Sequence, residues 1–295
     1  MGTSGSSSGS GRGTPLIPSW LDNAPSEPLP GGTDSGAAQS DGGDPGDQNQ
    51  GSDGTPPSAR PPLPAPADPE RFRSARTNFS RFAASGGSDD RALRRAVRDY
   101  ARRGTGGSGN AVRRMGPSRA AASNALGVFR GIQRDGVQET LRRLNLTALS
   151  GRSAQEVFIG LTEVVCKDGG PIDEAIARDA WLETIATMEG FGISDLDALT
   201  DEQIKEVFLS FIAHTIDARI YQEIGVNGFK FAADLDDIKS FDKQLQSYIE
   251  RSVRDSFTSD LSDLSSMSDE TIRQVVDKTY TEAWDLLQLL GDQEG

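Results

Sequence analysis

The chain has 295 residues, enough for one or two domains, yet only 35% of them are hydrophobic, while 33 are Gly and 15 are Pro. This composition excludes a chain that is folded over its whole length. Residues 1–70 hold two Arg and nine acidic residues, residues 71–152 hold eighteen Arg and five acidic residues, and residues 153–295 hold eleven Lys or Arg and thirty acidic residues. We expect these parts to be an arm, an Arg-rich helical segment and an acidic α-helical domain.

Targeting and redox features are sparse. Cys166 is the only cysteine, which excludes an intrachain disulfide. The first residues lack the basic start and apolar stretch of a signal peptide. No apolar run approaches the roughly 20 residues that span a bilayer. We therefore expect a soluble, cytoplasmic protein that does not contact a membrane.

Residues 1–70 are expected to form a long disordered arm, rich in Gly, Ser and Pro. One stretch of this arm, residues 14–21, holds large apolar side chains between prolines, which keep a chain extended and lower the entropy lost on binding. We interpret the stretch as a short docking motif for a partner protein, formed by Pro15, Leu16, Ile17, Pro18 and Trp20. A disordered tail with scattered apolar residues explains the same composition equally well.

The opening Met1-Gly2-Thr3-Ser4, the Gly/Ser run after it and Pro15 to Trp20 resemble the start of the QatB family, from the bacterial Qat anti-phage defence operon. The rest of the chain is similar only in its layout. The resemblance implies three partners from the same operon: an ATPase, a QueC-like enzyme and a TatD-like nuclease. It also implies that the QueC-like enzyme attaches a deazaguanine base to the α-amine of Gly2 after Met1 is removed, with Thr3 and Ser4 beside the modified residue.

In the Arg-rich segment, an apolar stripe predicts a helix over residues 89–103 with Ser88 as its N-cap. Gly104 to Gly109 should break it, and the small residues of 110–134 predict a second helix that lets another backbone approach closely. Five arginines of the first helix are candidate contacts to nucleic acid or to an acidic partner: Arg94, Arg95, Arg98, Arg102 and Arg103. Protein pairing is the favoured alternative, because the acidic residues 153–295 would oppose nucleic-acid binding.

Helical periodicity is clear from Gly136 onward. Ser153 and Thr200 open capping boxes, and Ser268 is a further N-cap. On the last helix, Trp284 shares a face with other apolar residues. We expect helices over 137–144, 153–166, 172–189, 201–216, 238–253 and 269–290. No stretch alternates in polarity like a β-strand, so the fold class is mainly α: a C-terminal helical bundle preceded by the arm.

Several motifs resemble dinucleotide-binding, catalytic or metal sites but lack the residues or the structural context that such sites need. Gly104, Gly106 and Gly109 match G-x-G-x-x-G, but an Arg-rich helix stands where a dinucleotide site needs a strand. His214 and Cys166 lie among apolar residues and are interpreted as core residues. The aspartates near positions 195 and 236 lack the glycine and closing glutamate of an EF-hand, and are interpreted as capping acids. We expect no metal and no cofactor.

Three functions remain open at this stage. The first is a non-enzymatic component of a defence complex, a scaffold and protein substrate modified at Gly2. The second is a nucleic-acid-binding module that uses residues 71–134, where Arg residues alternate with Phe and Tyr side chains that can stack on bases. The third is an enzyme in the helical domain, for which the sequence names no catalytic set.

Overall fold

The computed structural model describes residues 68, 70–166, 172–225 and 235–291. The chain divides into two units, Met1–Pro62 and Leu63–Gly295, and every described residue belongs to the second. All regular elements among these residues are helical, which confirms the predicted mainly α class. The predicted arm lies outside the described residues except for Asp68 and Glu70.

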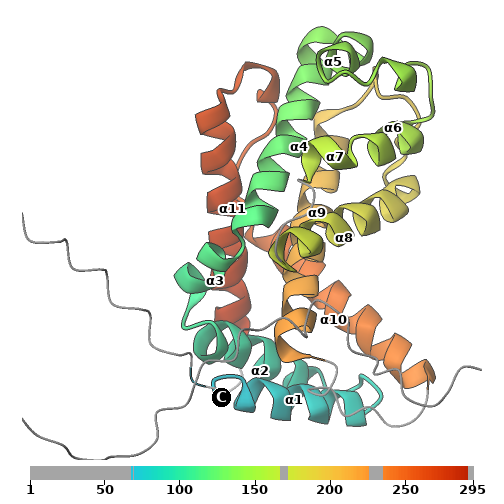
Figure 1. The fold of residues 1–295 in the computed structure, drawn as a ribbon. Helices are drawn as coiled ribbons and strands as arrows, with labels where there is room; N and C mark the ends of the chain where they lie inside the picture. The colour runs from blue at the N-terminus through green and yellow to red at the C-terminus, as the bar shows by residue number, and fades with distance from the viewer. Residues whose placement is uncertain (1–67, 69, 167–171, 226–234, 292–295) are drawn as a thin grey trace, which may run out of the picture. The chain divides into compact units, whose positions relative to one another are not determined.

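Figure 1 shows the helices in chain order. The first group is α1 (Arg73–Ala84), α2 (Asp90–Asp99), the π-helical turn η1 (Tyr100–Gly104), α3 (Ser108–Arg114), α4 (Gly116–Asp135), α5 (Val137–Arg143) and the 3-10 turn η2 (Thr147–Leu149). The second group is α6 (Ala154–Gly160), α7 (Thr162–Val165), α8 (Ile172–Thr187), η3 (Met188–Phe191), α9 (Asp201–Ile224), α10 (Leu235–Ser256), η5 (Leu264–Ser266) and α11 (Asp269–Leu290).

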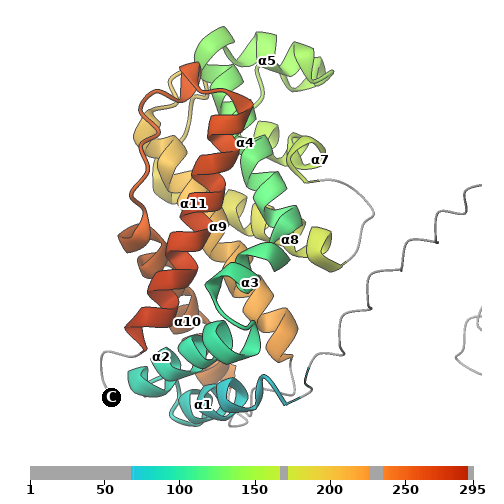
Figure 2. The same cartoon turned by 90° about the vertical axis from the view of Figure 1, so that its left-hand side faces the viewer.

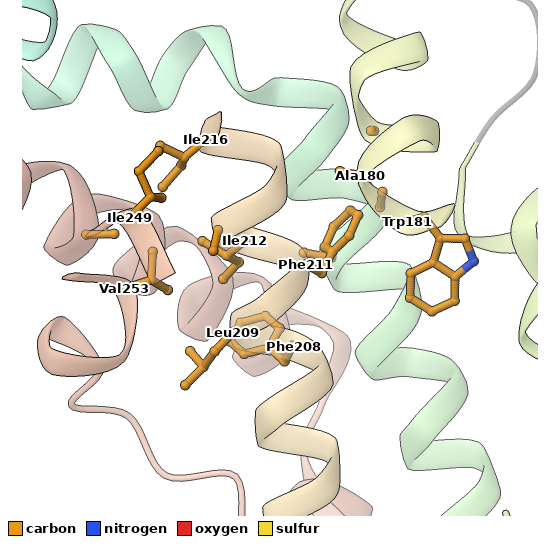
Figure 3. Close-up of a cluster of buried hydrophobic side chains, with 14 of the residues drawn as sticks. Ala180, Trp181, Phe208, Leu209, Phe211, Ile212, Ile216, Ile249 and Val253 are labelled. Carbon is orange, nitrogen blue, oxygen red and sulfur yellow. The ribbon is translucent and has the colours of Figure 1, made fainter. Parts of the chain in front are cut away.

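Helix α9 forms the centre of this unit. Every side chain from Val207 to Ile216 is buried, so this part of the helix is enclosed on all sides. Helices α4, α8 and α10 pack against it. In Figure 3, Phe211 points toward Trp181 of α8, and Ile212 lies on the opposite side of α9, toward Val253 of α10. The ring centroids of Phe211 and Trp181 are 5.9 Å apart.

Three of the predicted N-caps are confirmed. Ser153 and Thr200 each accept a hydrogen bond from the backbone N–H three residues later, at 3.3 and 3.2 Å, within complete capping boxes. Ser268 accepts from the N–H of Thr271 at 3.1 Å. The prediction for α2 is wrong by one residue: Asp89 is the cap and accepts from the N–H of Ala92 at 3.0 Å. The hydroxyl of Ser88 instead donates to the Ser85 carbonyl.

The structure interrupts three helices that the sequence predicts as continuous. The helix over 89–103 changes to a π-helical turn at Tyr100. The helix over 110–134 breaks at Met115, and α4 restarts with Pro117 in its first turn, where a missing N–H costs nothing. The helix over 153–166 breaks after Gly160, where an added Cβ would lie 2.3 Å from Cδ1 of Leu149.

Helix α11 joins the Arg-rich segment to the acidic part, because it packs against α2, α3, α4 and α10 (Figure 2). The prediction that Trp284 lies in the core is confirmed, since none of its side chain is exposed. The predicted helix over 172–189 buries Trp181 and Ile185, whereas its apolar residues Ile172 and Leu182 are 62% and 45% exposed.

Candidate functional site

The predicted N-terminal site residues lie outside the described residues. They are Gly2, Thr3, Ser4, Pro15, Leu16, Ile17, Pro18 and Trp20. Their roles therefore stay predictions.

The five candidate arginines lie on α2 and η1, and they do not converge on one site. Arg98 binds within the fold: Nη2 lies 3.0 Å from Oδ1 of Asp99, and Nη1 donates to the Gly291 carbonyl at 3.0 Å. This bond fixes a cation at the C-terminal end of α11, where the helix dipole favours it. Arg94 is half-buried and lines a small pocket of about 150 Å³ together with Tyr248. The other three side chains, Arg95, Arg102 and Arg103, are exposed.

A larger groove of about 350 Å³ lies between α4, α5, α7 and α11, and we call it the arginine groove. Its charged lining residues are Arg130, Arg134, Arg143, Asp269 and Arg273. Its apolar lining residues are Val128, Leu144, Val164 and Ile272. The remainder are small or polar: Ser123, Asn124, Gly127, Gly131 and Thr140. Four guanidinium groups therefore meet an apolar surface in one concave site.

Carboxylates hold these guanidinium groups in place. Arg130 contacts Asp269 at 2.5 Å and donates to the Met267 carbonyl at 2.7 Å. Asp135 bridges two arginines, with Nη2 of Arg134 at 2.9 Å and Nη1 of Arg143 at 2.5 Å. Hydrogen bonding from Arg134 lowers the pKa of the Asp135 carboxyl, and hydrogen bonding from Arg130 lowers that of Asp269. Both carboxylates stay ionised at neutral pH and keep the arginines oriented.

The floor of the arginine groove is the helix α4. Gly127 lies in the middle of this helix, and an added Cβ there would meet nothing within 4 Å. Gly131, one turn later, differs, because its added Cβ would lie 3.1 Å from the Thr140 side chain of α5. Packing against Thr140 explains why position 131 is a glycine, but no contact explains Gly127. At Gly127 the backbone of α4 is open to the groove.

A second polar cluster is buried and holds helices together. Glu223 of α9 accepts a hydrogen bond from the Tyr100 hydroxyl at 3.1 Å and pairs with Arg114 at 3.2 Å and Arg219 at 2.9 Å. Arg219 also pairs with Asp173 at the start of α8. Burial, with the charge of Glu223 beside it, raises the pKa of Tyr100. The cluster connects η1, α3, α8 and α9, and the side chains of Glu223 and Arg219 at its centre are nearly buried, so we interpret it as structural.

The isolated residues take the places expected of them. His214 is 6% exposed, and burial lowers the pKa of its imidazole. Cys166 is 2% exposed, and burial raises the pKa of its thiol to about 12. Asp197 caps α5 by accepting from the N–H of Val137 at 3.0 Å. Within the described ranges, no three His, Cys, Asp or Glu side chains are arranged to hold a metal ion.

No sequence motif points directly to the arginine groove. Its arginines are spread from Arg130 to Arg273, and only packing of α11 along α4 brings them together. The small residues of α4 were the available signal, because they predict close approach to its backbone.

Comparison of the chain with models of known protein families identifies the family to which it belongs. Residues 106–287 match the model of the Qat anti-phage system associated protein QatB, over more than half of the chain. The chain belongs to the QatB family. The match confirms the resemblance noted at the N-terminus, although it starts only at Gly106. It includes every lining residue of the arginine groove. Neither the curated proteins nor the solved structures contain a match.

Membership of the QatB family makes the chain a component of the Qat anti-phage system, with partners in that system. None of the helices that the structure describes has the length and apolar character needed to cross a membrane.

Proposed function

We propose that this member of the QatB family is a non-enzymatic scaffold and protein substrate, modified at Gly2 by a QueC-like partner. The carrying observation is the sequence of the first twenty-one residues, where an unhindered N-terminal glycine is followed by the docking motif at 14–21. After removal of Met1, the new terminus is a primary amine on a carbon without a side chain. Its pKa near 7.7–8.0 leaves part of the population unprotonated and nucleophilic at neutral pH.

The docking motif supplies the affinity in this proposal. Leu16, Ile17 and Trp20 are large apolar groups close in sequence to Gly2, and Pro15 and Pro18 limit the entropy lost when they bind. The helical unit from α1 to α11 supplies the scaffold that contacts the other Qat partners, the ATPase and the TatD-like nuclease. Modification and scaffolding thus use different parts of the chain.

Intact mass tests the substrate role. The protein is expressed with and without the QueC-like enzyme, and a mass addition at Gly2 is expected only in its presence. Gly2→Pro removes the primary amine and should abolish the addition. Trp20→Ala should weaken capture by the enzyme by about 1–2 kcal/mol, as loss of an aromatic anchor does. Ser6→Ala, nearer to Gly2 but outside the docking motif, is the matched control. An unmodified Gly2 in cells with intact phage defence would refute the substrate role.

Nucleic-acid binding by residues 71–134 is the second candidate, and the ion pairs argue against it. Arg119 pairs with Asp277 at 2.5 Å, Arg130 with Asp269 and Arg114 with Glu223, so this segment uses several arginines to bind acidic residues of its own chain. Salt-dependent retention of the full chain on single- or double-stranded DNA would favour the nucleic-acid alternative.

A further inference from the structure

We propose that the arginine groove binds a nucleoside phosphate, with the phosphates at the guanidinium groups and the base against the apolar wall. The proposal concerns a different site from Gly2 and does not depend on the modification. It involves binding only, because the sequence has no phosphate-binding loop of the hydrolase type and the groove presents no catalytic set.

The guanidinium groups suit clustered phosphates. Arginine offers five N–H donors in a planar fork that matches phosphate oxygens two at a time. In Arg134 the carboxylate of Asp135 engages Nε and Nη2, and in Arg143 the carboxylates of Glu139 and Asp135 engage Nε and Nη1. The remaining donors, Nη1 of Arg134 and Nη2 of Arg143, have no partner among the described residues. The carboxylates thus orient the guanidinium groups of Arg134 and Arg143 and leave one NH2 group of each to bind a ligand.

Size and charge favour a compact anion over a nucleic-acid strand. The volume of about 350 Å³ falls in the range of about 300–1,000 Å³ typical of small-ligand sites. The lining holds four arginines and one aspartate, while the whole chain carries a net charge of −13. Charges are screened only beyond a Debye length of about 8–10 Å. A nucleotide fits within this volume, whereas a long polyanion would have to extend beyond it.

The same geometry disfavours an acidic peptide. An extended peptide separates successive residues by about 3.3 Å and carries one charge per acidic side chain. A di- or triphosphate places two or more charges within a few bonds, close enough to meet several guanidinium groups of one small groove. The apolar wall formed by Val128, Leu144, Val164 and Ile272 gives the base a surface that a bare polyphosphate would not use.

Gly127 is the independent feature that supports a ligand against α4. Glycine in a helix interior destabilises the helix relative to alanine, and no neighbouring atom of the described fold requires it here. Its missing side chain leaves room for a ligand to approach the backbone. Alanine at this position should therefore stabilise the fold while it obstructs the groove.

Binding is measured by isothermal titration calorimetry on the full chain with ATP, GTP and sodium tripolyphosphate, at 50 and 300 mM NaCl. We expect ATP or GTP to bind in the micromolar to low millimolar range and more weakly at high salt. Arg134→Gln and Arg143→Gln should each weaken binding about tenfold or more. Arg142→Gln is the matched control, because Arg142 is an exposed neighbour on α5 that pairs with Glu139 but does not line the groove. Its affinity should stay unchanged.

Gly127→Ala separates a ligand role from a structural one. We expect a higher Tm, by about 2 °C, together with weaker nucleotide binding. A protein with Gly127→Ala that binds ATP as tightly as the parent would overturn the placement of the ligand against α4. Equal loss of affinity in the Arg142→Gln control would overturn the assignment to this groove.

Two further titrations test the ligand class. Tripolyphosphate that binds as tightly as ATP would show that the apolar wall contributes nothing, and would overturn the nucleoside part of the proposal. A 15-nucleotide oligothymidine that binds more tightly than ATP through Arg134 and Arg143 would overturn it in favour of nucleic acid. No binding of ATP or GTP at 50 mM NaCl would overturn the proposal as a whole.

Discussion

The rings of Tyr100 and Trp284 lie 5.9 Å apart between their centroids, at an angle of 32°. Both side chains are fully buried, and the pair joins the π-helical turn η1 to α11. On its other side, Tyr100 stacks on Phe72 at 5.6 Å. Three aromatic rings therefore connect the start of the described unit to its last helix.

Trp284→Ala should lower the free energy of unfolding by about 3–5 kcal/mol, because it leaves a large cavity beside Tyr100. Leu289→Ala is the matched control on the same helix, since that side chain is 54% exposed. Urea denaturation followed by circular dichroism measures both. Equal stability of the two variants would contradict the structural role of the ring contact.

Glu223→Gln should lower the free energy of unfolding by about 3 kcal/mol. The substitution leaves the half-buried Arg114 without its carboxylate partner and removes one of the two ion pairs of the buried Arg219, which keeps Asp173. Glu202→Gln, on the same helix, removes an exposed partner of Lys205 and should cost less than about 1 kcal/mol. Thermal unfolding of the two proteins side by side gives the comparison, and similar Tm values would argue against the buried cluster.

Asp217 predicts a dependence of stability on pH. Burial, together with the carboxylates of Asp242 and Glu250, raises the pKa of its carboxyl to about 7, and its Oδ1 has no hydrogen-bond partner in the described fold. An acid with a higher pKa in the folded state holds its proton more tightly there. Its contribution to stability is therefore full below about pH 4 and is lost as the pH rises toward 7.

Asp217→Asn should accordingly match the parent near pH 4 and be more stable than the parent at pH 8. His214 has the opposite effect: burial lowers its pKa, so its protonation destabilises the fold below about pH 6.5. Because the parent and the Asp217→Asn variant both contain His214, this effect cancels in the difference between their stabilities. Urea denaturation at both pH values tests this, with the exposed Asp285→Asn as control. An Asn variant no more stable than the parent at pH 8 would show that the carboxyl is well solvated.

Truncation tests the role of α1. Phe79 and Phe82 of this helix are fully buried, with ring centroids 6.3 and 5.1 Å from Phe241 of α10. A protein that lacks residues 1–88 should be less stable than one that lacks residues 1–67 by several kcal/mol, because Phe241 loses both neighbours. Melting curves of the two truncated proteins measure the difference. Coincident curves would place α1 outside the cooperative fold.

Local sequence signals predicted much of the fold and little of the site. The capping boxes at Ser153 and Thr200 identified helix starts because a cap depends on residues within one turn. The close approach of Leu149 to Gly160, where the predicted helix breaks, was missed because it involves a side chain outside the helix. The arginine groove was missed for the same reason: Arg143 and Arg273 are distant in sequence, and their proximity depends on how α5 and α11 pack against α4.

The position of α11 also sets an order of assembly. This last helix covers α2, α3 and α4, and the Gly291 carbonyl at its end accepts a hydrogen bond from Arg98. During synthesis, the helices that leave the ribosome first must wait for the last one before their apolar faces are covered. Until then Tyr100 and its neighbours stay accessible to chaperones, to other chains and to proteases. Emergence of α11 from the ribosome is thus the step at which the Arg-rich segment gains a stable surface.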